Sequence, residues 1–193
     1  MTAQLLQPFG GHGAWPGPGG PPQLWASALR QADQLLLTWC LASADADLDG
    51  CLQLPPAAAM ARRSDGLWQH TCFEAFVAAV DQESYLEVNL SPSGDWNVYG
   101  LQGYRRGLAP LAGLTSLPAR SDRQPRRLEL AVTLPLPPGL AAAPELAVGL
   151  TAVLEALAGG LSYWALHHPA AEPDFHHRGG FTLICPAADR GPH

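Results

Sequence analysis

The residues with the greatest capacity for chemistry lie near the end of the chain, in LSYWALHHPAAEPDFHHRGGF, Leu161–Phe181. This stretch holds the histidine pairs His167–His168 and His176–His177 together with Asp174. Imidazole and carboxylate groups bind transition metals when they converge on one point. Neighbouring residues on a strand point to opposite faces, so each pair offers one ligand at most. We therefore interpret LSYWAL as a strand and HHPAAEPDFHH as a loop packed back on it, fixed by a structural hydrogen bond from His176 to Asp174, with a metal site as the alternative.

A second candidate site combines an aromatic side chain with a carboxylate. Trp68 follows the loop-like stretch RRSDG and precedes a predicted strand that carries Glu74. A sugar needs flat aromatic surface for the C–H face of its ring and a few planar polar groups for its hydroxyls. Trp68 and Glu74 are suited to that task. The alternative is that Trp68 only caps the hydrophobic core, because aromatic residues serve packing first.

Other kinds of site find little support. The predicted hairpin register separates Glu74 from Glu87 by about 13 Å, at ~3.3 Å per residue, beyond the 5–10 Å that glycosidase carboxyl pairs require. His70 and Cys72 would share a face, but no third catalytic member accompanies them. Haem binding would need axial ligands, usually His or Met. Met60 is the one internal methionine and the sequence has no C-x-x-C-H attachment motif, so haem ranks below sugar. We predict a protein that is not an enzyme and carries no cofactor or metal.

Composition limits the class of protein. With 193 residues the chain forms one domain, residues 1–193, with a core from roughly residue 24 to 185. The net charge is −6, and the one arginine-rich stretch, RSDRQPRR, is interrupted by Asp122, so we expect no nucleic-acid partner. No apolar run approaches the ~20 residues of a membrane span. The N-terminus has no secretory pattern and the cysteines form no C-x-x-C pair, which predicts a cytoplasmic protein with reduced thiols.

Alternating apolar residues predict strands along most of the chain. Two runs, Cys72–Val80 and Tyr85–Ser91, flank the polar DQES and predict a hairpin in which Val80 faces Tyr85. Side chains alternate across a strand, so one face should be core and the other should carry Glu74, Phe76, Tyr85, Glu87, Asn89 and Ser91. The predicted core face carries Phe73, Val77, Leu86, Val88 and Leu90.

Further strands follow from the same period of two. The stretches ADQLLLTWCLAS and RRLELAVTLPL alternate cleanly, and PELAVGLTAVLEAL is assigned to a long strand rather than a helix because of its central glycine and threonine. LSYWAL and GFTLICP complete the set. Roughly ten short strands joined by turns rich in glycine and proline predict an all-β protein, an antiparallel β-sandwich of jelly-roll type in a single domain.

The motifs DGLWQHTCFEAF, YLEVNLSPSGDWNVYGLQGYRRG and LSYWALHHPAAEPDFHHRGGFTL resemble the DOMON-like domain family related to type 9 carbohydrate-binding modules. The resemblance covers roughly Leu24 to Cys185. It implies a β-sandwich whose relatives bind sugars between two tryptophans, with some distant members binding haem. On this resemblance Trp68 and Glu74 are the first aromatic and its polar partner, and Trp164 lies where the second aromatic is supplied. Asn89, Asn97 and Arg105 are further polar candidates.

The sequence thus predicts a non-catalytic module that binds a carbohydrate or a sugar-containing metabolite through an aromatic cleft. The alternative is a β-sandwich for structure or protein interaction with no small ligand. These hypotheses differ in the placement of Trp68 and Trp164, because a sugar cleft needs indole surface in reach of solvent. Neither the sugar nor a protein partner is specified by the residues, and a metal on His167, His168, Asp174, His176 or His177 stays open.

Overall fold

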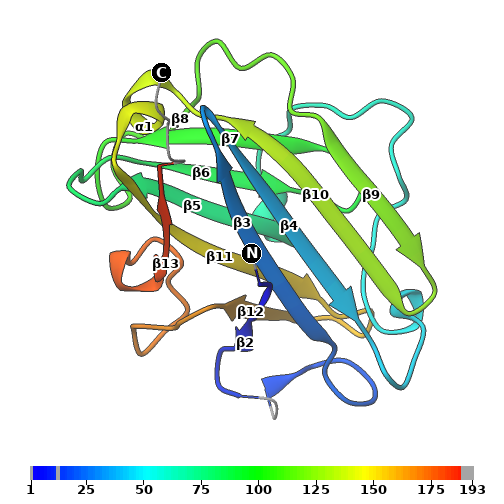
Figure 1. Ribbon diagram of the computed structural model, residues 1–193. Helices are drawn as coiled ribbons and strands as arrows, with labels where there is room; N and C mark the ends of the chain where they lie inside the picture. Colours follow the sequence, from blue (N-terminus) through cyan, green and yellow to red (C-terminus); the bar gives the residue numbers. More distant parts are fainter. Residues whose placement is uncertain (1, 12–13, 188–193) are drawn as a thin grey trace.

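A computed structural model of the chain describes residues 2–11 and 14–187, and these form two antiparallel sheets (Figure 1). A single short α-helix, α1, occurs in the described part, and none of its helices is long and apolar enough to cross a membrane. The strands are β1 (Gln4–Leu5), β2 (Gln7–Pro8), β3 (Gln23–Gln31), β4 (Gln34–Ala42), β5 (Cys72–Ala79), β6 (Tyr85–Leu90), β7 (Trp96–Leu101), β8 (Ala109–Pro110), β9 (Ala119–Gln124), β10 (Arg127–Pro135), β11 (Glu145–Glu155), β12 (Leu161–Ala165) and β13 (Leu183–Pro186), and α1 spans Pro138–Ala142.

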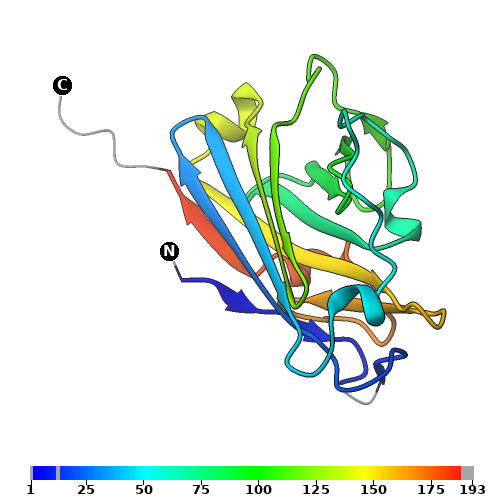
Figure 2. The same ribbon diagram turned by 90° about the vertical axis from the view of Figure 1, so that its right-hand side faces the viewer.

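The sheets stack face to face as a sandwich (Figures 1 and 2). One has five strands in the order β1-β3-β4-β10-β9, and the other has eight. In the larger sheet the order is β2-β12-β11-β5-β6-β7-β8, and β13 pairs with the first part of β11. The predicted antiparallel β-sandwich is therefore confirmed.

Alternation places the core between the sheets. Strands β3, β4 and β10 bury every second residue, while the intervening residues are at least partly exposed. The predicted inward residues of the β5–β6 hairpin, together with Trp39 and Leu130 from the facing sheet, belong to one buried cluster. The long strand predicted over PELAVGLTAVLEAL is also confirmed as β11. Period two thus identified the inner face of both sheets.

The central strands of the larger sheet are buried on both faces. All eight residues of β5 and all six of β6 are buried, which a half-exposed sheet would not show. A second apolar cluster on the outer face contains Phe76, Tyr85, Tyr99 and Phe181. This outer face, under the segments that follow β7 and β12, is where the candidate site lies.

The hairpin register differs from the prediction by two residues. Phe76 pairs with Glu87, and Glu74 pairs with Asn89, so the turn is longer than the expected DQES. A shift of two preserves which face each side chain occupies, and for that reason alternation could not detect it. The consequence is chemical. Glu74 and Glu87 are diagonal neighbours on one face, a relation that separates Cβ atoms by about 7–8 Å or less rather than the expected 13 Å.

Candidate functional site

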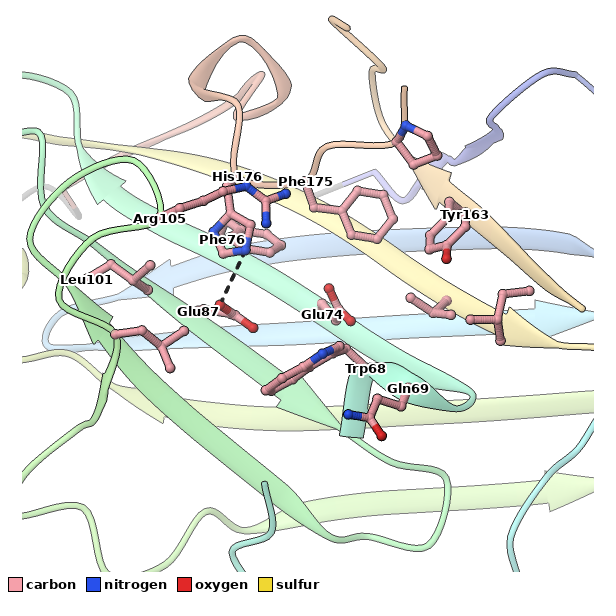
Figure 3. Close-up of a pocket in the computed structure, with 14 residues that line it drawn as sticks. Trp68, Gln69, Glu74, Phe76, Glu87, Leu101, Arg105, Tyr163, Phe175 and His176 are labelled. Atoms are coloured by element: carbon pink, nitrogen blue, oxygen red, sulfur yellow. Dashed lines mark ion pairs between the residues drawn. The ribbon is translucent and has the colours of Figure 1, made fainter. Parts of the chain in front are cut away.

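A cavity of about 600 Å³ opens on the outer face of the eight-stranded sheet (Figure 3). Glu74 and Phe76 of β5 and Glu87 of β6 form its floor. Trp68 lies on one side, and Phe175 lies on the opposite side with its neighbours from the last loop. The size is in the range of small-ligand pockets, and the mixture of rings and carboxyl groups suits a polar ligand with an apolar face.

The two carboxyl groups of the floor are buried and incompletely bonded. Glu74 is 3% exposed and Glu87 is 4% exposed. Asn89 donates from Nδ2 to Glu87 Oε1 at 2.8 Å. Glu74 Oε1 and Glu87 Oε2 have no hydrogen-bond partner among the residues that the structure describes. Buried polar atoms without a protein partner are rare in folded proteins, and each of these oxygen atoms is open to a donor from an ordered water or a ligand.

Burial also changes the charge of the floor. It raises the pKa of Glu74 well above its ordinary value, and the neighbouring Glu87 raises it further. Burial likewise raises the pKa of Glu87, although the hydrogen bond from Asn89 and the positive charge of Arg105 oppose the shift. Two carboxyl groups in one apolar site cannot both ionise without cost. The floor therefore retains protons to a higher pH than exposed glutamates do.

His176 contacts the floor from above. Its Nε2 atom lies 3.8 Å from Glu87 Oε2, the pair joined by the dashed line in Figure 3, and its Nδ1 atom is 2.8 Å from the Tyr85 hydroxyl. Burial and the nearby Arg105 lower the pKa of His176 to about 4, so the imidazole is neutral at neutral pH. This contact is consequently between a neutral ring and a carboxyl group rather than between two charges.

Asp174 joins the two loops that form the upper wall. It accepts hydrogen bonds from the Tyr104 hydroxyl at 2.7 Å, from Arg105 Nη2 at 2.9 Å and from the backbone N–H of His176 at 3.1 Å. Burial raises the pKa of Asp174, but these hydrogen bonds outweigh it and the pKa is lowered. The expected structural role of Asp174 is thus confirmed. The expected partner was wrong in one respect, because the imidazole of His176 bonds Tyr85 instead.

Trp68 stands on a short turn, η3 (Leu67–Gln69), that begins after Gly66. Gly66 has a positive φ of 73°, which glycine adopts without strain. Beneath the turn, the Tyr99 hydroxyl donates to Asp65 Oδ1 at 2.7 Å, and the indole of Trp68 meets the Tyr99 ring edge-on at 5.9 Å. Trp68 remains 37% exposed and lines the cavity. The indole is thus in reach of solvent at one side of the cavity and is not a core residue.

Asn89 and Asn97, two of the predicted polar ligands, are buried and have partners within the protein. Asn89 bonds Glu87, and Asn97 donates to Asp65 Oδ1 at 2.9 Å and to the Ser64 carbonyl at 3.2 Å. Neither lines the cavity. They hold the carboxyl floor and the Trp68 loop in place, and the prediction that they contact ligand is corrected accordingly. Arg105, in contrast, does line the cavity at its rim.

Trp164 does not form the second wall predicted from the sequence. Its side chain is 1% exposed and belongs to the main core, and its Nε1 atom donates to Ser162 Oγ at 2.9 Å. Because strand residues alternate, burial of Trp164 turns its neighbour Tyr163 outward, into the cavity lining. Tyr163 meets Phe175 edge-on at 6.0 Å. The second aromatic wall is therefore made by Tyr163 and Phe175.

The histidine-rich loop does not assemble a metal site in the described part of the chain, where no group of three or more His, Cys, Asp or Glu side chains converges. His168 Nε2 lies 2.9 Å from the Gln7 carbonyl oxygen, and His177 Nδ1 accepts from the Gly179 N–H at 3.1 Å. These contacts connect the last loop to β2 and to its own turn. The metal alternative consequently gains no support from the geometry.

Comparisons with known proteins give a likeness of fold. No protein-family profile and no curated protein sequence matches the chain. A provisionally assigned carbohydrate-binding protein from Bacteroides uniformis ATCC 8492 is similar in structure, with a TM-score of 0.59 and 13% identity over 86% of this chain and 79% of that one. A family 9 carbohydrate-binding module from Caldicellulosiruptor kristjanssonii, solved with cellotriose, gives a TM-score of 0.51 and 9% identity over 89% and 80% of the two chains. The chain thus shares the β-sandwich fold of carbohydrate-binding modules.

We expect Glu74→Gln to flatten the dependence of stability on pH. The pKa of Glu74 is raised in the folded protein, so the folded state holds its proton to a higher pH than the unfolded state does. The free energy of unfolding therefore falls as pH rises from the ordinary glutamate pKa of about 4.3 through the raised folded pKa, by about 1.4 kcal/mol for each pH unit that separates the two values. Glutamine removes this loss because its amide does not ionise.

Urea unfolding of the two proteins at about pH 4, 6 and 8 measures the effect. The variant should match the wild type near pH 4 and exceed it near pH 8. Some slope should persist because the pKa of Glu87 is raised as well. Glu83→Gln is the matched control, since Glu83 lies in the turn of the same hairpin with its side chain 84% exposed. Parallel pH profiles for wild type and Glu74→Gln would contradict the raised pKa.

Proposed function

We propose that the chain is a non-catalytic module that binds a carbohydrate in the cavity above β5 and β6. The observation that carries the proposal is the half-exposed indole of Trp68 facing a floor of two buried carboxyl groups, Glu74 and Glu87, each with an oxygen atom that lacks a partner among the described residues. An aromatic face with a few convergent polar groups is the equipment of a sugar site.

The likeness of fold supports this proposal without naming a ligand. The module from Caldicellulosiruptor kristjanssonii was solved with cellotriose, so a β-sandwich of this fold can present a saccharide site. The sequence motifs resemble those of the DOMON-like family, and we propose that the chain is a DOMON-like relative of family 9 modules. A cytoplasmic location, which the sequence predicts, is compatible with the four free cysteines.

In this proposal each part of the cavity has a distinct task. The indole of Trp68 stacks on the C–H face of one sugar ring, and Tyr163 with Phe175 limits the opposite side. Glu74 and Glu87 accept hydrogen bonds from hydroxyl groups when ionised, and a protonated carboxyl group can donate one instead. Arg105 adds a donor at the rim. Affinity should be modest, roughly 10 µM to 1 mM, because a small ligand exchanges water for protein partners.

Calorimetric titration with common mono- and disaccharides, together with a glycan array, tests the proposal. We expect saturable binding of at least one sugar in that affinity range. The register of β5 and β6 brings the two carboxyl groups near enough that distance no longer argues against hydrolysis, so the titrated disaccharides should also be analysed for products. Cleavage would replace the binding-module proposal with an enzyme. Failure of every sugar on both assays would favour a sandwich for protein interaction.

A further inference from the structure

We propose that the cavity prefers a sugar carrying a protonated amine, an amino sugar, over the neutral parent sugar. This inference rests on the proposed carbohydrate function and specifies the ligand class of the same site. The observation behind it is the unpaired Oε1 atom of Glu74, a side chain 97% buried that lines the cavity. A buried carboxylate without a partner is costly, and a ligand ammonium group would supply both the opposite charge and the hydrogen-bond donors that it lacks.

The charges around the cavity favour a cation. Two carboxyl groups, Glu74 and Glu87, line it against a single guanidinium, Arg105. That guanidinium is already bonded to Asp174, a carboxylate just outside the lining, at 2.9 Å. His176 contributes no charge near neutral pH, because burial lowers its pKa. Carboxyl groups therefore dominate the floor, because the cationic side chain of the lining, Arg105, is already paired with Asp174 at the rim.

The walls also suit an ammonium group. Trp68, Tyr163 and Phe175 surround the floor with aromatic rings, and Phe76 adds a ring within it. Figure 3 shows Glu74 and Glu87 between Trp68 on one side and the Phe76–His176–Phe175 group on the other. Ring faces attract cations, most strongly where water is excluded. Aromatic walls alone would bind any apolar face. Aromatic walls combined with an unpaired buried carboxyl group select for positive charge.

The protonation of the floor is consistent with this preference. Burial raises the pKa values of Glu74 and Glu87, so the floor holds protons to a higher pH than exposed glutamates do when no cation is bound. An ammonium group would take the place of such a proton. A neutral sugar could still bind to the protonated floor through hydroxyl groups, and for this reason we expect a preference for the amine rather than exclusion of the neutral sugar.

Matched pairs of ligands test the inference by calorimetry on the intact chain. The pairs are glucosamine with glucose, galactosamine with galactose, and mannosamine with mannose, at about pH 7, where amines of α-amino type are mostly protonated. Cyclohexylamine serves as an ammonium probe on a six-membered ring without hydroxyl groups. We expect the amino sugar of at least one pair to bind tenfold or more tightly than its parent.

Variants identify the group responsible. Glu74→Gln should reduce the affinity ratio within the pair to about one, because it removes the charge and keeps the shape. Glu83→Gln, an exposed change on the same hairpin, should leave the ratio unchanged. Circular dichroism confirms that each variant is folded. If Glu74→Gln does not fold, Glu87→Gln replaces it, since Glu87 is the second unpaired carboxyl group of the floor.

The outcomes separate the two proposals. Equal affinity within every pair would refute the preference for amino sugars and leave the carbohydrate function in place. Binding of cyclohexylamine without any of the six sugars would refute the amino-sugar ligand while locating an ammonium site, and the disaccharides and the glycan array would then decide the carbohydrate function. A tenfold ratio that persists in Glu74→Gln and in Glu87→Gln would refute the role of the carboxyl floor. Failure of all seven probes would refute the preference for amino sugars, and failure of the disaccharides and the glycan array as well would refute the carbohydrate function.

Discussion

Trp164→Ala should lower the free energy of unfolding by about 3–5 kcal/mol, the range for removal of a buried large aromatic side chain. The indole is among the largest fully buried side chains and packs within the main core between the two sheets. Alanine leaves a cavity that the sandwich can fill only in part. The change also removes the hydrogen bond from Nε1 to Ser162 Oγ, although Ser162 keeps its own bond to the Leu154 carbonyl at 3.3 Å.

Urea unfolding measures this effect: a lower midpoint at an unchanged slope is a loss of stability, whereas a changed slope indicates a change in compactness. Trp164→Phe is the matched control, because it keeps an aromatic ring in the core and should recover part of the loss. If the variant is folded at low temperature, its sugar affinity should be close to that of the wild type, since Trp164 lies outside the cavity lining. A loss of less than about 1 kcal/mol would mean that the indole is not core.

The contrast between Trp164 and Tyr163 shows what the sequence could and could not determine. Alternation establishes that one of two neighbouring residues faces inward, but the motif SYWALHH is apolar on both sides. Strand β12, which begins at Leu161, pairs with β11. Ala152 of β11 lies opposite Trp164 and belongs to the core. Ala152 shares the apolar inner face of β11 with Leu150 and Leu154, so this pairing assigns Trp164 to the core. Strand pairing is a long-range property that composition and period do not reveal.

The carboxyl floor was missed for a related reason. Alternation correctly placed Glu74 and Glu87 on one face, and that part of the hairpin was predictable. The separation of the two groups depends on the turn length, and a turn longer by two residues keeps every face unchanged while it moves Glu87 toward Glu74. Burial of that face could not be foreseen either, because the covering Phe181 and Phe175 arrive from a segment about a hundred residues later in the chain.

The loops were predictable as loops but not in their contacts. Asp174 was expected to bond within the protein, and it does. Its partners Tyr104 and Arg105 lie in a turn 70 and 69 residues away, where Arg105 adopts a positive φ of 53°. No local pattern predicts such a contact. Together these two loops form one wall of the cavity. The sequence identified Arg105 as a candidate but did not specify the contact with Asp174 that positions it.

Trp68→Ala should reduce sugar affinity by a hundredfold or more, to the limit of detection, with a far smaller effect on stability than Trp164→Ala. A stacking platform provides much of the apolar contact of a small polar ligand, and a hundredfold loss moves a Kd of roughly 10 µM to 1 mM to about 1–100 mM, at or beyond the weak limit expected for the wild type. The indole is partly exposed and contacts Tyr99 at its edge. Its removal should therefore lower the free energy of unfolding by at most about 2 kcal/mol, less than the loss of a fully buried aromatic residue.

Titration of Trp68→Ala with the sugar that binds the wild type, and urea unfolding of the same sample, measure both quantities. Trp68→Phe should retain a fraction of the affinity, because a smaller ring still offers a face for stacking. Trp25→Ala is a control for loss of an indole outside the cavity, since Trp25 is on β3 in the opposite sheet. Undiminished binding by Trp68→Ala would transfer the platform role to Tyr163 and Phe175. Unfolding of the variant would instead make Trp68 a structural residue, and the half-exposed indole would no longer support a sugar site.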